Sequence, residues 1–247
     1  MLFGKTLAML QLMKLLTLFV FCLVCLNFSY AKDNHQASST NWDEIGPHYK
    51  IIKGCKLAAP PQKNSKAEKS DFEILFHWQK HRTNAEYQRA LSEAHVTFKS
   101  FFGQPNGLLS ENELKILDPI FEKVMWTADV ASHNQKQYWK RLRPFVTKPQ
   151  LETCTKISKR SLSYPSGHAT IAVAEALVLS KFFPERLKQL IERANEIGLD
   201  RVICAVHHPS DIEAGRECGK QVYEQLLKNQ EFLLDVKKAR EALPKNH

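Results

Sequence analysis

The chain lacks the patterns from which β-sheets, repeat arrays and metal centres are usually recognised. After residue 70 no stretch alternates apolar and polar residues, and no segment repeats another. No cysteine or histidine pair has zinc-like spacing, and the adjacent His207 and His208 are poorly placed to converge on one ion. We therefore expect neither a sheet-based fold nor a repeat protein, and no metal and no cofactor.

A concentrated basic block is also absent. The formal net charge is +9 at pH 7, but the lysines and arginines are scattered among acidic residues and are not interleaved with aromatic ones. Surfaces that bind nucleic acids normally show such clustering. We expect no nucleic-acid partner, and we interpret the excess charge as a mild preference for anionic substrates or surfaces.

Long apolar runs are missing except at the N-terminus. Residues 1–31 contain two lysines, no acidic residue, an apolar run over 15–26 and small residues at the end of Ser29-Tyr30-Ala31. This layout is typical of a signal peptide cleaved before Lys32. A retained membrane anchor is the alternative, but the run is short for a span of roughly 20 residues. We expect a periplasmic or secreted protein with no stable membrane span after cleavage.

Four cysteines follow the predicted signal peptide: Cys55, Cys154, Cys204 and Cys218. Export to an oxidising compartment makes disulfides possible. Four cysteines allow three pairings, and the sequence does not choose among them. Cys204 lies in the apolar run 202–206, so a buried free thiol is an equal alternative there.

The remaining chain predicts an all-α, single-domain helical bundle. Residues 32–70 are polar, contain three prolines and read as an irregular N-terminal arm, whereas 71–247 follow helical patterns. Gly198 marks an expected helix end. Capping boxes are expected at Thr83 with Glu86, Ser110 with Glu113, and Ser210 with Glu213.

The most informative stretch is Pro165-Ser166-Gly167-His168, which precedes an apolar segment expected to be helical through Phe183. Ser166 would cap the helix, and Gly167 would let an anion approach the free backbone N–H groups of the first turn. Taken alone, the same residues are equally consistent with a loop-to-helix junction that carries a surface histidine.

Upstream, Lys136 and Arg143 are seven residues apart and would share one face of a helix that ends before Pro144. The guanidinium of Arg143 can bind two phosphate oxygens at once. In isolation the two cations are better explained as a solvated face, and the fork of Arg143 is what favours a functional role. We interpret Lys140 and Arg141 as ordinary surface charges.

Downstream, Arg201, His207 and Asp211 form a third group. A short helix over 201–206 followed by a turn could bring Arg201 and His207 together. With Ser210 as the next N-cap, Asp211 could accept the Nδ1 proton of His207 and leave Nε2 as a free lone pair. For Asp211 alone, an ordinary helix-terminal carboxylate is a reasonable alternative.

Together these three groups, in this order, resemble the signature of the type 2 phosphatidic acid phosphatase superfamily. The flanking Ser163-Tyr164 and Val202-Ile203-Cys204 are more specific and resemble the bacterial class A non-specific acid phosphatases, which are exported and soluble. The resemblance covers most of residues 58–225. It implies the helical bundle of that superfamily and an acid phosphatase with a broad range of phosphate monoester substrates.

The resemblance also implies roles. His207 would attack phosphorus and carry a transient phosphohistidine, His168 would protonate the leaving alcohol and then activate water, and Asp211 would orient His207. The phosphate oxygens would be bound by Lys136, Arg143, Ser166, Gly167 and Arg201. No metal is implied, an acidic optimum is expected, and a homo-oligomer is possible.

Two positions depart from the family pattern. Asp200 replaces the usual serine before Arg201; it could compete with phosphate for the guanidinium, or point outward as an N-cap, which we favour. His208-Pro209 replaces a tryptophan and a polar residue, in a region that could shape the substrate pocket.

Alternative functions share the same residues. One is a phosphatase specialised for lipid-like phosphate esters, and another is a vanadium haloperoxidase, for which the chain is short. A third, from a different class, is a phosphate-binding protein without turnover, although such a protein would not need both His168 and His207.

Overall fold

The chain folds into α-helices joined by loops. The computed structural model describes residues 46–51, 54–105 and 107–244, so the predicted signal peptide lies outside the described residues. The helices are α2 (Lys66–His81), α3 (Asn84–Ser92), α4 (Phe98–Phe102), α5 (Glu111–Trp139), α6 (Pro144–Thr147), α7 (Gly167–Leu179), the 3₁₀ turn η2 (Pro184–Arg186), α8 (Leu187–Ile203), α9 (Pro209–Leu226) and α10 (Gln230–Ala242). Two isolated bridges are the only β-pairing in the described ranges, so the predicted all-α fold is confirmed.

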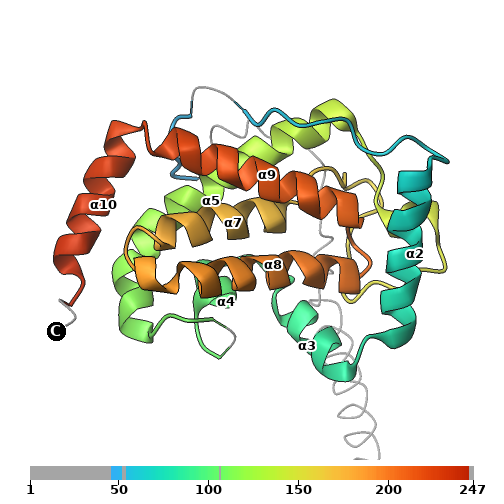
Figure 1. Cartoon of the computed structure of the whole chain (residues 1–247), viewed down its shortest axis with the longest axis horizontal. Helices are drawn as coiled ribbons and strands as arrows, with labels where there is room; N and C mark the ends of the chain where they lie inside the picture. Colours follow the sequence, from blue (N-terminus) through green and yellow to red (C-terminus); the bar gives the residue numbers. More distant parts are fainter. Residues whose placement is uncertain (1–45, 52–53, 106, 245–247) are drawn as a thin grey trace, which may run out of the picture. The chain divides into compact units, whose positions relative to one another are not determined.

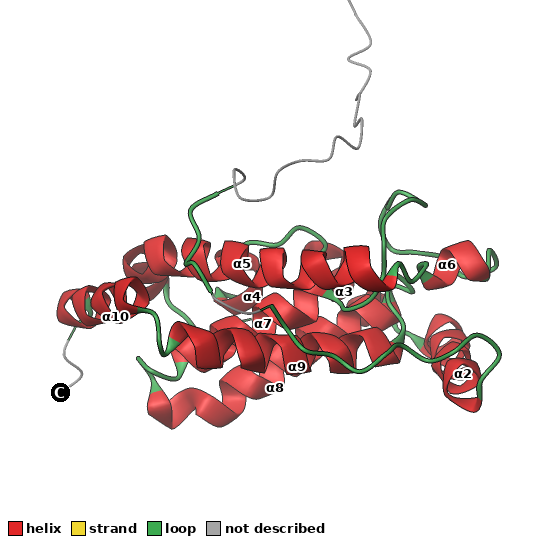
Figure 2. Cartoon of the chain, turned by 90° about the horizontal axis from the view of Figure 1, so that it is seen from above, coloured by secondary structure: helices red, strands yellow, loops and turns green. Residues whose placement is uncertain are grey.

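Helix α7 lies at the centre of the bundle because it is apolar on nearly every side. Most of its residues after His168 are buried, which is typical of a helix enclosed by others. Helices α5, α8 and α9 pack around it (Figures 1 and 2). Helix α7 ends at Leu179, before the expected end at Phe183.

In the described part of the chain, no helix combines the length and the apolar character that a membrane span requires.

Glycines allow α9 to approach its neighbours closely. A Cβ on Gly215 would lie 2.6 Å from the Ser166 carbonyl oxygen, and one on Gly219 would lie 2.5 Å from that of Thr170. Gly198 does not end a helix as predicted: it lies inside α8, where a Cβ would meet Ile212 at 2.8 Å. The predicted helix end is wrong because this glycine serves helix packing.

The structure contains two of the three capping boxes that the sequence predicts. Thr83 with Glu86 and Ser110 with Glu113 form the predicted capping boxes. The box at Ser210 is wrong, because α9 begins at Pro209 and its N-cap is His208. The Ser210 side chain instead donates to the Asp71 carboxylate.

The described residues before Lys66 lie in no helix, but α2 begins within the segment 32–70 that was expected to be irregular. Two disulfides cross-link the chain: Cys55–Cys218 joins this segment to α9, and Cys154–Cys204 joins the loop before α7 to the turn after α8. Cys204 is therefore not a free buried thiol.

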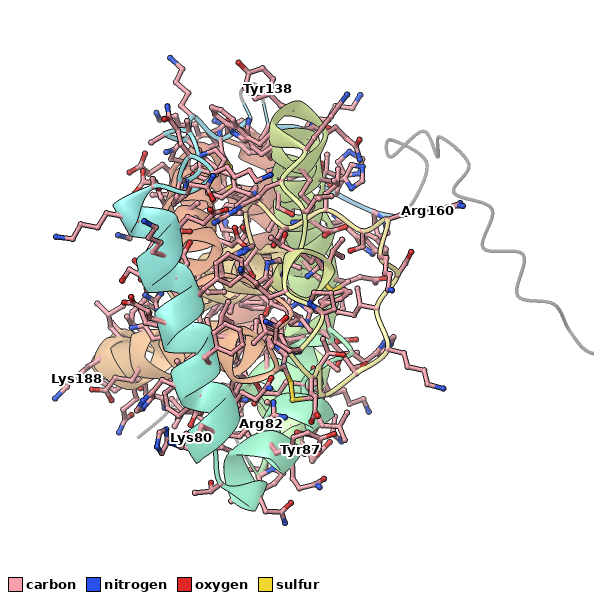
Figure 3. The ribbon with its side chains drawn as sticks, turned by 90° about the vertical axis from the view of Figure 1, so that its right-hand side faces the viewer. Lys80, Arg82, Tyr87, Tyr138, Arg160 and Lys188 are labelled. Carbon is pink, nitrogen blue, oxygen red and sulfur yellow. A yellow bond between two sulfur atoms is a disulfide. The ribbon has the colours of Figure 1, made fainter. Side chains whose placement is uncertain are left out.

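Helix α2 packs against the ends of α8 and α9. Arg82, at the C-terminus of α2, donates a hydrogen bond of 2.8 Å to the Ile203 carbonyl, and its guanidinium lies 5.1 Å from the ring of Tyr87 (Figure 3). The hydrogen bond from Arg82 attaches α2 to the C-terminal end of α8. The third sequence motif continues from this helix end into the following turn.

Candidate active site

The third motif occupies the turn between α8 and α9. The sequence predicts a short helix over 201–206, but Arg201 belongs to the last turn of the long helix α8. Beyond it the chain turns through Ala205, whose φ of 53° is left-handed, and the His207 N–H donates to the Arg201 carbonyl at 3.2 Å. Asp211 follows in the first turn of α9, so the turn brings His207 to it.

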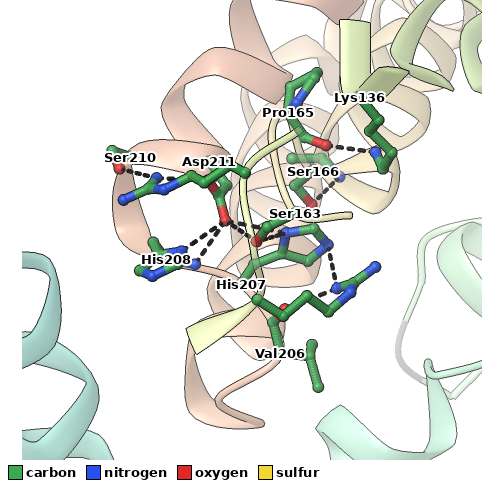
Figure 4. A network of polar contacts seen from close by, with 12 residues as sticks. Lys136, Ser163, Pro165, Ser166, Val206, His207, His208, Ser210 and Asp211 are labelled. Atoms are coloured by element: carbon green, nitrogen blue, oxygen red, sulfur yellow. Dashed lines mark hydrogen bonds and ion pairs between the residues drawn. The ribbon is translucent and has the colours of Figure 1, made fainter. Parts of the chain in front are cut away.

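The His207 ring is buried between a carboxylate and a guanidinium (Figure 4). Its Nδ1 lies 3.3 Å from Asp211 Oδ2, and its Nε2 lies 3.0 Å from an Nη1 of Arg143. Because arginine can only donate, Nε2 must accept, and the ring proton therefore lies on Nδ1, facing Asp211. The Nε2 lone pair therefore accepts a hydrogen bond from Arg143 and is not the free lone pair that the sequence predicts.

Asp211 is buried and surrounded by donors. Its carboxylate accepts from Ser163 Oγ at 2.5 Å, from the His208 backbone N–H at 2.8 Å and from Arg141 Nη1 at 2.6 Å. Burial acts to raise the pKa of Asp211, but the hydrogen bonds from His207 and His208 and the charge of Arg141 outweigh it and hold the pKa well below its ordinary value. The site thus favours the charged form of this carboxylate.

Arg141 is not the ordinary surface charge that the sequence suggests. The segment around it is extended, with Leu142 paired to Leu162 in an antiparallel bridge. Alternate residues of an extended segment share one side, so Arg141 and Arg143 both face inward while Leu142 is 51% exposed. One arginine reaches Asp211, and the other reaches His207.

The first motif is assembled across a helix end rather than along one helix face. Helix α5 ends at Trp139 and Lys140 is left-handed, so the expected helical stripe from Lys136 to Arg143 is wrong. Arg143 instead precedes α6 and donates to the Val206 carbonyl at 2.7 Å. The Lys136 ammonium donates to the Pro165 carbonyl, next to the second motif.

The second motif begins α7 as predicted, with Ser166 as its N-cap. The Ser166 hydroxyl accepts from the Ala169 N–H at 3.4 Å and is buried. A Cβ on Gly167 would lie 3.7 Å from Lys136 Nζ, so a side chain there would fill space beside the ammonium. The N–H groups of this first turn have no acceptors within the helix.

His168 has the opposite tautomer to His207. Its Nε2 lies 3.1 Å from the Glu93 carbonyl, which can only accept, so Nε2 carries a proton. Nδ1 is then the nitrogen that can gain and release a second proton. The ring also packs 5.8 Å from that of Phe101.

Arg201 is buried and only partly satisfied. Its Nη2 donates to the Ala90 carbonyl at the end of α3, but its Nε has no hydrogen-bond partner among the described residues. An unpartnered donor of a buried cation is costly unless an acceptor binds there. Arg201 therefore offers an unused donor to an anion.

Four predicted site residues meet in one pocket of about 140 Å³. Its lining consists of Ala94, Arg143, Thr155, Lys156, Ile157, His168, Arg201, Val206 and His207. Of the other predicted residues, Asp211 lies behind His207, Ser166 serves as a helix cap, and Lys136 and Gly167 adjoin each other beyond the lining. In the described part of the chain, no three His, Cys, Asp or Glu residues are arranged to hold a metal, and metal independence stays a prediction.

Burial and mutual repulsion lower the pKa values of the site's cations. Burial, then the charge of Arg143, lowers the pKa of Lys136 to about 8, and burial lowers that of Arg143 to about 10. Burial, followed by Arg143, lowers the pKa of His207 to about 3, and burial with Arg201 holds that of His168 well below its ordinary value. Such a site favours an incoming anion, which would relieve the repulsion.

At both positions that depart from the family pattern, the side chain lies elsewhere than the sequence predicts. Asp200 is not an outward N-cap: it lies within α8, is fully buried, and accepts two hydrogen bonds of 2.9 Å from Arg89. His208 does not line the pocket, because its Nδ1 lies 3.1 Å from Asp211 Oδ2 and its ring contacts Phe72 at 5.3 Å. Both side chains therefore contact residues that lie outside the pocket lining.

Sequence reasoning missed the residues that hold the site from outside the motifs, notably Ser163, Arg141, Glu93 and Arg89. Ser163 and Arg141 adjoin motifs, so their proximity was a usable signal. Glu93 contributes a backbone carbonyl, which any residue could supply, and Arg89 is paired only by tertiary packing. No local pattern identifies these two.

The sequence profile of the PAP2 superfamily matches residues 123–219. This part of the chain is therefore similar to the PAP2 superfamily. All three motifs, from Lys136 to Asp211, lie within the matched residues. The pocket is thus built mainly from the matched residues, while Ala90 and Glu93 add the backbone carbonyls that bind Arg201 and His168.

Curated proteins are similar in sequence to part of this chain. A non-specific acid phosphatase of Providencia stuartii is 34% identical over 154 residues, 60% of each chain, and one of Salmonella typhi is 39% identical over 117 residues, 46% of each. The chain thus aligns with less than two thirds of these relatives' lengths. A bacterial vanadium-dependent iodoperoxidase has a similar fold, with a TM-score of 0.53 at 12% identity over 78% of this chain and 62% of that one.

Proposed function

We propose that this protein is an exported, metal-independent acid phosphatase that hydrolyses phosphate monoesters through a phosphohistidine on His207. The observation that carries the proposal is one pocket in which a buried and a half-buried histidine, His207 and His168, have opposite tautomers and face two buried arginines. The named relatives, both non-specific acid phosphatases, support it. A protein that only bound phosphate would not need this pair of histidines.

In the first step, the Nε2 lone pair of His207 forms a bond to phosphorus while the ester P–O bond breaks. The leaving oxygen takes the bond electrons and a proton from His168. Asp211 accepts the Nδ1 proton of His207 as a hydrogen bond and stabilises the positive charge that develops on the ring. The product alcohol then leaves.

In the second step, water attacks phosphorus and gives a proton to His168. The N–P bond breaks, its electrons return to His207 Nε2, and inorganic phosphate is released. Throughout both steps Arg143 and Arg201 stabilise the negative charge on the non-bridging oxygens, with Lys136 and the first turn of α7 beside them.

The two histidines explain the expected acid optimum. The pKa of His207, lowered to about 3 by burial and Arg143, keeps its ring neutral and nucleophilic in mild acid. The pKa of His168 is lowered by burial and Arg201, so its second proton is gained only at acid pH. A bound phosphate monoester opposes the effect of Arg201 and favours the protonated His168 on binding.

The size of the pocket fits a broad substrate range. At about 140 Å³ it is smaller than the roughly 300–1,000 Å³ of sites that enclose a whole small molecule. It can enclose a phosphoryl group, so most of the alcohol would lie outside. The N-terminal pattern of residues 1–31 and the two disulfides support export to the periplasm or beyond.

The test is hydrolysis of p-nitrophenyl phosphate in the presence of a chelator across the acid and neutral pH range. The wild type should be active, with most activity at acid pH, and His207→Ala should lose roughly 10⁴-fold or more of kcat/KM. His77→Ala, which removes an exposed histidine of α2, is the matched control and should retain activity.

Mass spectrometry of the quenched enzyme should locate phosphate on His207. Chelator-sensitive activity, or an active His207→Ala variant, would contradict the proposal. Phosphate binding without turnover in the wild type would favour a non-catalytic phosphate-binding protein instead.

A further inference from the structure

Behind the pocket, a buried ion pair joins α3 to α8. The Nε and Nη2 atoms of Arg89 donate to the two carboxylate oxygens of Asp200, each at 2.9 Å. The Asp200 side chain is completely buried, whereas that of Arg89 is 26% exposed. Arg89 also lies 3.3 Å from Glu196, one turn earlier on α8. Because the contact between Arg89 and Asp200 is bidentate, it fixes both the distance between the two helices and their relative orientation.

The end of α3 holds two residues of the candidate site. The Ala90 carbonyl, next to Arg89 in the chain, accepts from Arg201 Nη2. The Glu93 carbonyl, at the C-cap of the same helix, accepts from His168 Nε2 at 3.1 Å. The last turn of α3 therefore orients both a pocket arginine and a pocket histidine through backbone atoms.

Apart from its ion pairs, helix α3 is held by a small apolar cluster that includes Ala90 and Tyr87. It has nine residues, and Ala90 is its one buried residue. A helix of this length is marginal by itself, so its position depends on tertiary contacts. Besides Arg89 with Asp200, a second buried contact joins the Glu93 carboxylate to Arg193 of α8. Both contacts are ionic and both end on α8.

We propose that Arg89 and Asp200 are positioning residues that set the phosphate-binding geometry of Arg201 and the orientation of His168 through the last turn of α3. The inference rests on the proposed phosphatase function for its kinetic readout. Without Arg89, the buried Asp200 carboxylate loses both donors and lies next to Arg201, the nearest site cation in the chain. Loss of Arg89 therefore disturbs the site in two ways. The last turn of α3 is no longer fixed to α8, and an unpaired carboxylate is left beside Arg201.

The experiment compares Arg89→Ala, Arg89→Lys, Asp200→Ala and the double variant Arg89→Ala/Asp200→Ala. Each is assayed for kcat and KM with p-nitrophenyl phosphate, and for affinity to inorganic phosphate by calorimetry. Arg89→Ala should lower kcat/KM roughly 10- to 100-fold and weaken phosphate binding, because small displacements of site groups have effects of this size. Arg89→Lys should recover part of the loss, since lysine supplies one donor in place of a fork.

The double variant separates positioning from stability. It contains no uncompensated buried charge, so it should melt at a higher temperature than Arg89→Ala. Its kcat/KM should nevertheless stay as low as that of Arg89→Ala. Arg186→Ala is the matched control: its side chain is also 26% exposed and pairs with Glu113, and neither residue lines the pocket. It should change stability without changing kcat/KM or phosphate affinity.

Wild-type kcat/KM and phosphate affinity in the double variant would overturn the inference, as would an equal loss in Arg186→Ala. If the wild type binds phosphate but hydrolyses no phosphate ester, the proposed function fails on its own. Calorimetry then still decides the positioning role: unchanged phosphate affinity in Arg89→Ala and the double variant overturns it, and weakened affinity supports it.

Discussion

Arg143 and Arg201 are buried cations of the site, and Lys136 is a half-buried one. Each has its pKa lowered, mainly by burial, and for Lys136 and Arg143 also by a neighbouring arginine. Arginine stays charged under all ordinary conditions, whereas a lysine whose pKa is about 8 does not. The residue in the site most sensitive to alkali is therefore Lys136.

The first prediction concerns the charge of Lys136. As the pH rises through about 8, the ammonium loses its proton, and KM for a phosphate monoester should rise because one cation beside the phosphoryl group is lost. Lys136→Arg should show a flatter dependence of KM on pH. Steady-state kinetics on either side of this pKa provide the measurement, and an identical alkaline rise in KM for both proteins would contradict it.

At the scale of elements, the pocket depends on loops and helix ends that are held by cross-links. The lining residues Thr155, Lys156 and Ile157 directly follow Cys154, whose disulfide partner Cys204 lies between Arg201 and His207. This bridge ties one wall of the pocket to the turn that presents His207. The other bridge, Cys55–Cys218, joins residues outside the pocket lining.

The two disulfides should therefore differ in their effect on activity. Their sequence separations are 50 and 163 residues, for which loop-closure entropy corresponds to about 4 and 5 kcal/mol of stability. Replacing either pair by serines should lower the free energy of unfolding in urea. Only the Cys154→Ser/Cys204→Ser variant should lower kcat/KM markedly. Equal kinetic effects of the two double variants would contradict this division.

The approach of α9 to α7 offers a second prediction at this scale. Gly215 faces the Ser166 carbonyl at the start of α7, and Gly219 faces that of Thr170 one turn further on. Alanine at either position overpacks the interface and should cost about 1–3 kcal/mol of stability. Gly215→Ala should also reduce kcat/KM, since it displaces the first turn of α7, whereas Gly219→Ala should have a smaller kinetic effect. Chemical denaturation and kinetics test both.

At the scale of the whole molecule, the core contains a carboxylic acid that has no hydrogen-bond partner among the residues that the structure describes. Glu175 lies in the middle of α7, is fully buried, and neither of its carboxylate oxygens has a hydrogen-bond partner among the described residues. Burial, and secondarily the charge of Asp118, raises the pKa of Glu175 well above its ordinary value. The folded protein thus binds a proton here more tightly than the unfolded chain does.

This proton makes the fold more stable in acid. The contribution is fully present below the unfolded pKa of about 4.5 and is lost as the pH rises toward the raised folded pKa. Glu175→Leu should therefore raise the free energy of unfolding at neutral pH, by about 1–3 kcal/mol, and change it less in acid. Thermal melts across this range provide the measurement. Glu192→Leu, at an exposed site of α8, is the control, and a pH-independent effect of Glu175→Leu would refute the explanation.

The sequence predicted well wherever local rules suffice. The capping boxes at Thr83 and Ser110 and the start of α7 at Ser166 follow from side chains within three residues of the helix start. Predictions failed where a distant residue intervened. Ser210 was expected to cap α9, but its hydroxyl is bound to Asp71, which lies far away in the chain.

The sequence by itself determined which chemical groups the site contains and the order in which the chain presents them. Only the tertiary structure decided which groups face the pocket and which support it. Asp200 shows the reason: its role depends on Arg89, more than a hundred residues away, and no local pattern encodes that pairing. Helix caps arise from short-range hydrogen bonds, whereas buried charges find their partners only when distant helices pack together.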